Sequence, residues 1–214
     1  MNWYKKIILS SKNIQFPDDI EEQIDEISNK TVEYYFSQQN EKIFGGTFNF
    51  INPYNNQLNS IPPIIHPFTI EFKNTIAIFN PQKRILSIFP YHHNIKDINP
   101  SNFFNYIKSY IYHEITHAID PKFLIEDWWR NRQDVDYLLR EEEFDAYSKQ
   151  IEQTIKNNIN DINIENLKMW LKTDNTDLMP GCLKDHLDII QYWKINKPIY
   201  MKKLKQRLYN FFIG

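Results

Sequence analysis

The sequence predicts an α+β fold, with a small mixed or antiparallel sheet in the first half and a mainly helical second half. Short runs of β-branched and aromatic residues, separated by Gly, Pro and Asn, fill the chain up to residue 98. Beyond it, apolar residues recur at helical spacing almost to the last residue. The 214 residues suffice for one well-formed core, and no repeat or low-complexity linker divides them. We therefore predict one domain over 1–214, with a sheet-containing lobe at 1–98 and a helical lobe at 99–214.

The first half is predicted to begin with a possible short strand and a long helix. Gly45-Gly46 interrupts the chain before the next strand, and Asn80-Pro81 opens a turn before the last one. The stretch 52–67 is rich in Asn and Pro and is predicted as a long loop. The expected elements are a strand at 4–9, a helix at about 16–39, and strands at 47–51, 68–72, 75–79 and 84–89.

The second half is predicted to consist of helices. Asn99 is a suitable N-cap and Pro100 suits the first helical position, so a helix should begin there. The expected helices cover 101–119, 139–159, 164–172, 183–194 and 198–212.

Composition excludes several classes of partner and leaves the oligomeric state open. The net charge is near −2, and the most basic segment, 202–207, alternates with apolar residues as the solvated side of an amphipathic helix does. We therefore expect no nucleic-acid partner and no membrane partner. The single Cys182 rules out an intramolecular disulfide. The N-terminal apolar run is too short for a signal peptide and no run approaches a membrane span, so we expect a cytoplasmic protein.

The stretch His113-Glu114-Ile115-Thr116-His117 carries the strongest chemical signal. Two imidazoles four residues apart lie on one face of a helix, where both can bind one metal ion. Glu114 lies between them, placed to act on a metal-bound water. The preceding segment, 103–112, keeps apolar residues at helical spacing, which makes two ordinary surface histidines the weaker interpretation. We predict His113 and His117 as metal ligands and Glu114 as the catalytic residue.

A catalytic zinc ion needs a third protein ligand. The position six residues beyond His117 is Phe123, which cannot bind a metal. A cluster of carboxylates at 141–143 begins the next predicted helix and supplies the candidates.

On these residues the chain resembles the gluzincin metallopeptidases, in which a His-Glu-x-x-His helix is followed by a glutamate ligand on a second helix. The resemblance covers about residues 106–150. It implies a zincin-like fold, a bound Zn²⁺ ion, and a peptide or protein substrate aligned by an edge strand, for which 75–79 and 84–89 are the candidates. It also implies an oxyanion donor in the helical half. The eligible residues are Tyr147, His186, Tyr192 and Tyr200.

Helical phase narrows the choice of the third ligand. Glu142 points away from the inward side of its helix, whereas Glu141 and Glu143 flank that side about equally. Glu143 is followed three residues later by Ala146, which matches the Glu-x-x-Ala form of several gluzincin groups. Glu141 is followed four residues later by Asp145, which resembles the thermolysin-like form with a supporting Asp. We favour Glu143 and keep Glu141 as the alternative.

Other ligand-type or aromatic residues are assigned ordinary roles. Asp120 could orient a ligand imidazole, but we favour it as the end of the helix before Pro121. Cys182 and His186 are spaced as a helical metal pair, which we take as coincidence. His92-His93 is expected on a surface loop. Trp128-Trp129 is expected to pack under the long connection to the second helix, and stacking on a substrate is the alternative.

The motif leads to a predicted zinc metallopeptidase. Glu114 would take a proton from the attacking water and pass it to the departing amine. Two alternatives remain open. One is a non-catalytic interaction protein with a zincin-like fold, within a virion or a host-directed complex. The other is a regulatory protease with one specific cellular partner.

Overall fold

The structure is a computed structural model, which describes residues 19–37, 41–51, 58–67, 76–90, 99–119, 136–173 and 175–213. The chain divides into two compact units, Met1–Arg132 and Gln133–Gly214. The described part of the first unit holds two helices and all the strands, and that of the second unit is helical. The predicted α+β class is confirmed, with helix in the majority. A single domain over 1–214 with a lobe boundary at 98 stays a prediction, although the helix that carries the two histidines belongs to the first unit.

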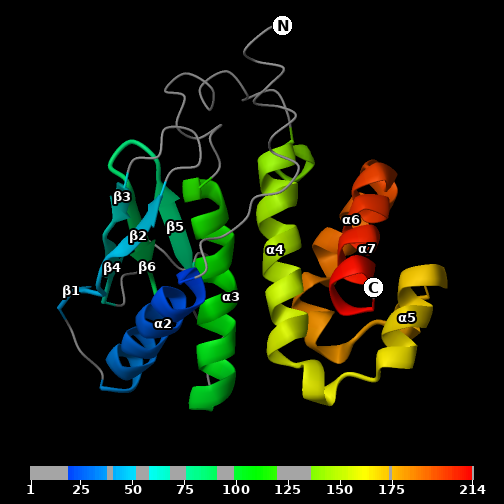
Figure 1. Ribbon diagram of the computed structural model, residues 1–214, viewed down its shortest axis with the longest axis horizontal. Coiled ribbons are helices and arrows are strands. Elements are labelled where there is room, and N and C mark those ends of the chain that lie inside the picture. Colours follow the sequence, from blue (N-terminus) through cyan, green and yellow to red (C-terminus); the bar gives the residue numbers. More distant parts are fainter. Residues whose placement is uncertain are drawn as a thin grey trace, which may run out of the picture. The chain divides into compact units, whose positions relative to one another are not determined.

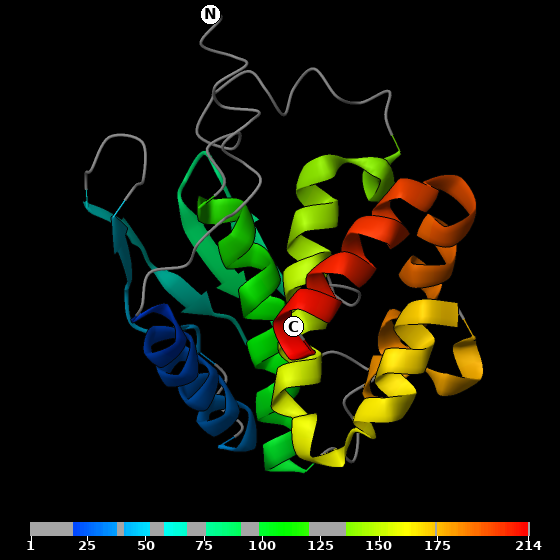
Figure 2. The same ribbon diagram turned by 45° about the vertical axis from the view of Figure 1, so that its right-hand side comes forward.

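Two helices of the first unit, α2 (Ile20–Phe36) and α3 (Pro100–Ile119), lie side by side (Figure 1, Figure 2). Their apolar faces enter one core, because residues such as Ile24 and Ile107 are fully buried in it. The start of α3 is confirmed: Pro100 is its first residue, and Oδ1 of Asn99 accepts the N–H of Asn102 at 2.8 Å.

The strands form a four-stranded mixed sheet and a separate hairpin. The four-stranded sheet has the order β1-β4-β6-β5, in which β4 and β6 are parallel and the other two pairs are antiparallel. The hairpin pairs β2 with β3. The strands are β1 (Ile43–Phe44), β2 (Phe48–Ile51), β3 (Leu58–Ile61), β4 (Pro63–Ile65), β5 (Ala77–Asn80) and β6 (Ile85–Ile88). Within the described residues, β5 is an edge strand and β6 is an inner one, so the prediction that 84–89 could be an edge is wrong.

The predicted loop at 52–67 is also wrong where it is described, because β3 and β4 lie within it. Proline has no N–H to donate, but its carbonyl still accepts. The carbonyl of Pro62 accepts from Leu86 N at 3.2 Å, and that of Pro63 accepts from Gly45 N at 2.9 Å. Ile65, fully buried in the core, anchors the same strand. The segment therefore forms a strand despite its loop-like composition, because its proline carbonyls accept hydrogen bonds and Ile65 is buried in the core.

The second unit is a helical bundle built on α4 (Glu141–Asn157), α5 (Ile164–Thr173), α6 (Leu187–Asn196) and α7 (Pro198–Phe212). These helices match the predicted ones, except that the start of the predicted 183–194 helix is a 3₁₀ segment, Gly181–His186. The short 3₁₀ turn Tyr137–Leu139 is tied to the bundle by Trp193 Nε1, which donates to the carbonyl of Leu138 at 2.7 Å. The largest fully buried side chains of the core are Trp170, Trp193, Tyr200 and Phe144.

Several predictions fall outside the described residues. They are the strands at 4–9 and 68–72, His92-His93, Asp120, Phe123 and Trp128-Trp129. In the portion of the chain that is described, no helix has both the length and the apolar character needed to cross a membrane.

Candidate metal centre

His113 and His117 lie one turn apart on α3, with their Nε2 atoms close together. Both are buried, and the two Nε2 atoms are 3.2 Å apart. The ring planes meet at 81°, so the nitrogens converge without the rings stacking. Two imidazole nitrogens that bind one tetrahedral zinc at about 2.05 Å lie about 3.3 Å apart. The observed separation therefore fits two ligands of one metal ion.

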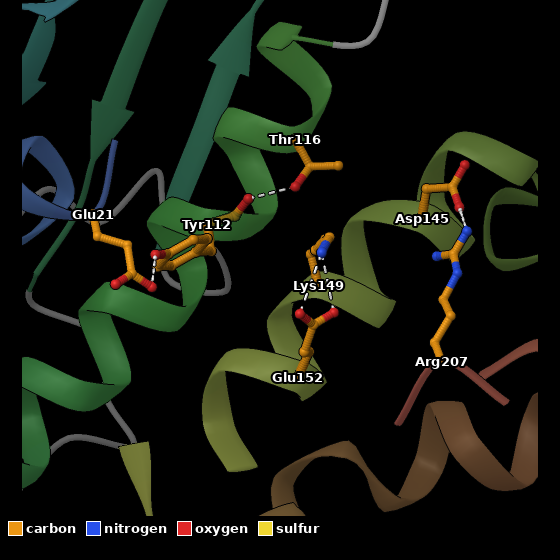
Figure 3. A network of polar contacts seen from close by, with 7 residues as sticks. All are labelled: Glu21, Tyr112, Thr116, Asp145, Lys149, Glu152 and Arg207. Atoms are coloured by element: carbon orange, nitrogen blue, oxygen red, sulfur yellow. Dashed lines mark hydrogen bonds and ion pairs between the residues drawn. The ribbon is translucent and has the colours of Figure 1, made fainter. Parts of the chain in front are cut away.

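The rotation of α3 is fixed by polar contacts beside the motif. The hydroxyl of Tyr112 donates to Glu21 on α2 at 3.1 Å (Figure 3). Lys108 forms an ion pair with Asp25, also on α2. Together with the apolar core, these contacts set which way the two histidines face.

Glu114 is held between the sheet and the histidine nitrogens. Its Oε2 accepts the backbone N–H of Phe79 on β5 at 2.7 Å. Its Oε1 lies 4.0 Å from His113 Nε2, and the side chain is 13% exposed. The carboxylate is thus anchored through one oxygen while the other lies near the nitrogen pair.

The contact with Phe79 uses the outer side of an edge strand. Phe89 N donates to the carbonyl of Ile76 at 2.7 Å, which fixes the phase of the antiparallel pair. Backbone groups alternate in direction along a strand, so those of Ala77 and Phe79 point away from β6. Glu114 therefore meets β5 on the side where a further strand would pair.

The three consecutive glutamates at the start of α4 differ in exposure. Glu141 is exposed, while Glu142 and Glu143 are each 4% exposed. The expectation that Glu142 points away from the buried side is therefore wrong. The reason is that α4 is buried over more than one stripe, since Ser148 and Gln150 are buried as well. Because Glu141 is exposed and Glu143 is buried, their exposure separates the two candidate ligands, which helical phase does not.

Asp145, the supporting residue in the alternative with Glu141, has a partner in its own unit. Its Oδ1 accepts from Arg207 on α7 at 2.6 Å (Figure 3). The same guanidinium lies 5.1 Å from the centre of the Phe144 ring. Asp145 thus joins α4 to α7, which favours Glu143 over the thermolysin-like register.

His113, His117 and Glu143 form a buried group of three ligand residues that could hold a metal ion. These are the three ligands predicted from the sequence. The two histidines were identified by their spacing, and the glutamate by its helix and by Ala146. The position of the Phe79 N–H beside Glu114 was not predicted, because no sequence pattern announces a backbone donor 35 residues away.

The remaining candidates have local contacts in the second unit. His186 Nε2 lies 3.2 Å from the Thr154 hydroxyl. Burial raises the pKa of the Cys182 thiol to about 11, so the thiolate that binds metal is disfavoured at neutral pH. The hydroxyl of Tyr200 donates to the Leu139 carbonyl at 3.0 Å.

The hydroxyl of Tyr192 donates to Asp136, and this hydrogen bond raises the pKa of Tyr192. The Tyr147 ring meets the Trp193 ring edge-on at 6.2 Å. An oxyanion role for Tyr147, His186, Tyr192 or Tyr200 stays a prediction.

Comparison with protein-family models, with curated proteins and with solved structures found no match for this chain.

Proposed function

We propose that this protein is a zinc-dependent hydrolase of peptide bonds with a zincin-like fold. The observation that carries the proposal is the placement of Glu114, whose anchored carboxylate lies beside two converging imidazole nitrogens. A metal site that only stabilised a fold would have no use for a carboxylate held in that position.

The proposed ligands are His113 and His117 from the first unit and Glu143 from the second. Two imidazoles and one carboxylate are the donor set of several catalytic zinc sites, and they leave a fourth position for water. The spacing of 3.2 Å between the histidine nitrogens and the burial of all three side chains support this assignment. The same set is what the resemblance to gluzincins implies.

When bound, a zinc ion would supply Lewis acidity and lower the pKa of a water molecule towards neutrality. Glu114 would act as general base through Oε1, the oxygen that does not accept from the Phe79 N–H. The proton it accepts is passed to the departing amine. By holding Oε2, the Phe79 N–H fixes the direction of Oε1.

The substrate would bind as an additional strand along β5. Because the Phe79 N–H is bonded to Glu114, an extended peptide would pair with the outward N–H and carbonyl of Ala77 and the outward carbonyl of Phe79. This binding mode would bring a scissile carbonyl beside the base.

The proposal is tested by replacing the base alone. Glu114→Gln keeps the shape of the side chain and removes its ability to accept a proton. Glu33→Gln on α2, an exposed carboxylate, is the matched control. Zinc-loaded wild type and control should cleave members of a mixed peptide library followed by mass spectrometry, while Glu114→Gln binds zinc and cleaves none. Equal cleavage by Glu114→Gln and wild type would contradict the proposal.

A further inference from the structure

The second unit contains a groove of about 530 Å³ on α5, α6 and α7, which the metal chemistry does not use. Its walls carry four lysines, which are named here the lysine groove: Lys172, Lys194, Lys202 and Lys205. The first three are exposed and Lys205 is half-buried. None of the described residues that line the groove is Asp or Glu. A concave surface with several cations and no carboxylate favours an anionic ligand.

The floor of the groove is apolar. Leu171 is 7% exposed and Met201 is 6% exposed, and both line the groove. A ligand that matches this surface needs negative groups for the walls and an apolar group for the floor. A simple inorganic anion offers only the first.

The groove is elongated along α7. Its lining positions on this helix run from Pro198 to Tyr209, which corresponds to about 17 Å at the rise of an α-helix. An extended peptide of about five residues has that length. A single carboxylate or phosphate group would fill only a small part of it.

The cations on the other faces of α7 have partners within the chain. Arg207 pairs with Asp145 at 2.6 Å, and Lys203 lies 5.8 Å from the centre of the Tyr200 ring. Lys202 and Lys205 are three residues apart and therefore share the groove side, so a ligand in the groove meets both side chains.

We infer that the lysine groove binds an extended acidic segment of another protein, with carboxylates on the lysines and an apolar side chain on Leu171 and Met201. Single-stranded nucleic acid fits less well, because the lining residues that the structure describes include one aromatic residue for base stacking, Tyr209, and no arginine. The inference stands apart from the peptidase proposal, since it uses none of the metal-site residues.

The test measures binding of a fluorescein-labelled peptide in which Glu alternates with Leu, by fluorescence anisotropy at low salt. The full-length chain carries Glu114→Gln in every sample, so that cleavage cannot interfere. The double variant Lys194→Glu/Lys202→Glu reverses two wall charges and should weaken binding about tenfold. Its matched control, Lys83→Glu/Lys184→Glu, changes the net charge equally at exposed lysines outside the groove. The control should stay within about twofold of the parent.

Two further peptides measure separately how much the charges and the apolar side chains of the peptide contribute to binding. Replacing Glu by Gln or Leu by Ser in the peptide should each weaken binding several-fold. Equal weakening by both lysine pairs, or no binding by the parent, would overturn the inference. So would tighter binding of a thymidine oligonucleotide or of anionic phospholipid vesicles with the same dependence on Lys194 and Lys202, because the groove would then serve a different polyanion.

Discussion

The backbone N–H of Phe79 donates a hydrogen bond of 2.7 Å to Oε2 of Glu114, a residue 35 positions later in the chain. This contact joins the edge of the four-stranded sheet to the helix that carries both histidines. It orients the carboxylate by a backbone donor, which any substitution of Phe79 except proline retains. Under the proposed function, β5 has two roles: it holds the general base, and its outer side offers backbone groups to a substrate strand.

The first prediction concerns this hydrogen bond. Replacing the residue at Phe79 by its α-hydroxy acid analogue turns the amide into an ester and removes the N–H while keeping the side chain. We expect peptide hydrolysis to fall about 10- to 100-fold, because a hydrogen bond to a charged group is worth about 1.5–3 kcal/mol. Zinc affinity should stay unchanged, since Glu114 is not a ligand. Steady-state cleavage rates and a chelator competition measure the two effects.

The control for the ester is the same replacement at Ala77. Its N–H also points away from β6, but no hydrogen bond to Glu114 uses it. A loss of activity that is equal at both positions would assign the effect to a weakened strand and remove the special role of Phe79.

The second prediction ranks the glutamates of α4. Glu143→Ala should weaken zinc binding strongly, because it removes one of three protein ligands. Glu141→Ala removes an exposed carboxylate in the first turn, worth about 0.3–1 kcal/mol through the helix dipole, and should leave the affinity nearly unchanged. Competition with a chromogenic chelator gives the ranking. The reverse order would support the thermolysin-like register with Asp145.

The third prediction concerns the link between α4 and α7. Asp145 is 12% exposed in its side chain and Arg207 is 33% exposed. Arg207→Gln leaves the more buried partner with an uncompensated charge, so it should lower the free energy of unfolding by about 1–3 kcal/mol. Asp145→Asn should cost less, because the remaining guanidinium still reaches solvent. Urea unfolding measures both.

An exposed ion pair provides the reference for that experiment. Glu165 and Lys168 lie 2.7 Å apart on the surface of α5. Glu165→Gln should leave the free energy of unfolding nearly unchanged, because exposed ion pairs contribute little. A loss as large as that of Arg207→Gln would mean that the Asp145 contact has no special importance.

The fourth prediction concerns Cys182. Burial first, and then the charge of Asp161, raise the pKa of its thiol to about 11. At pH 8 the folded protein should react with iodoacetamide about two orders of magnitude more slowly than the urea-unfolded chain, because only the thiolate attacks. The folded state holds this proton more tightly, so the contribution to stability is present below the ordinary thiol pKa. It is lost as the pH rises from about 8.5 towards 11. Equal rates of alkylation of Cys182 in the folded and the urea-unfolded protein would contradict the raised thiol pKa.

Local spacing explains which parts of the fold could be predicted from the sequence. Helix α3 was predicted within one residue of its ends, because Asn99-Pro100 marks its start and apolar residues repeat along it. The closeness of His113 and His117 could be predicted as well, because residues four apart lie on the same face of a helix. The sequence does not predict which strand lies at the edge of the sheet, because strand order depends on pairings between distant segments.

Two errors have physical causes of the same kind. Strand β4 was missed because Pro62 and Pro63 contribute only carbonyl acceptors, which composition alone does not reveal as pairing groups. Glu142 was assigned to the polar side because periodicity assumes one buried stripe per helix. On α4 the polar Ser148 and Gln150 are buried too, so a single stripe does not describe it.

The metal content of the purified protein tests the central claim most directly. Protein prepared without chelator and analysed by plasma emission spectroscopy should contain close to one zinc per chain. His113→Ala and His117→Ala should each lose it, because a site with two remaining protein ligands binds weakly. His66→Ala, a histidine on neither α3 nor α4, should retain it. Wild-type protein that is metal-free, and stays so after zinc is added and the excess removed, would contradict the account.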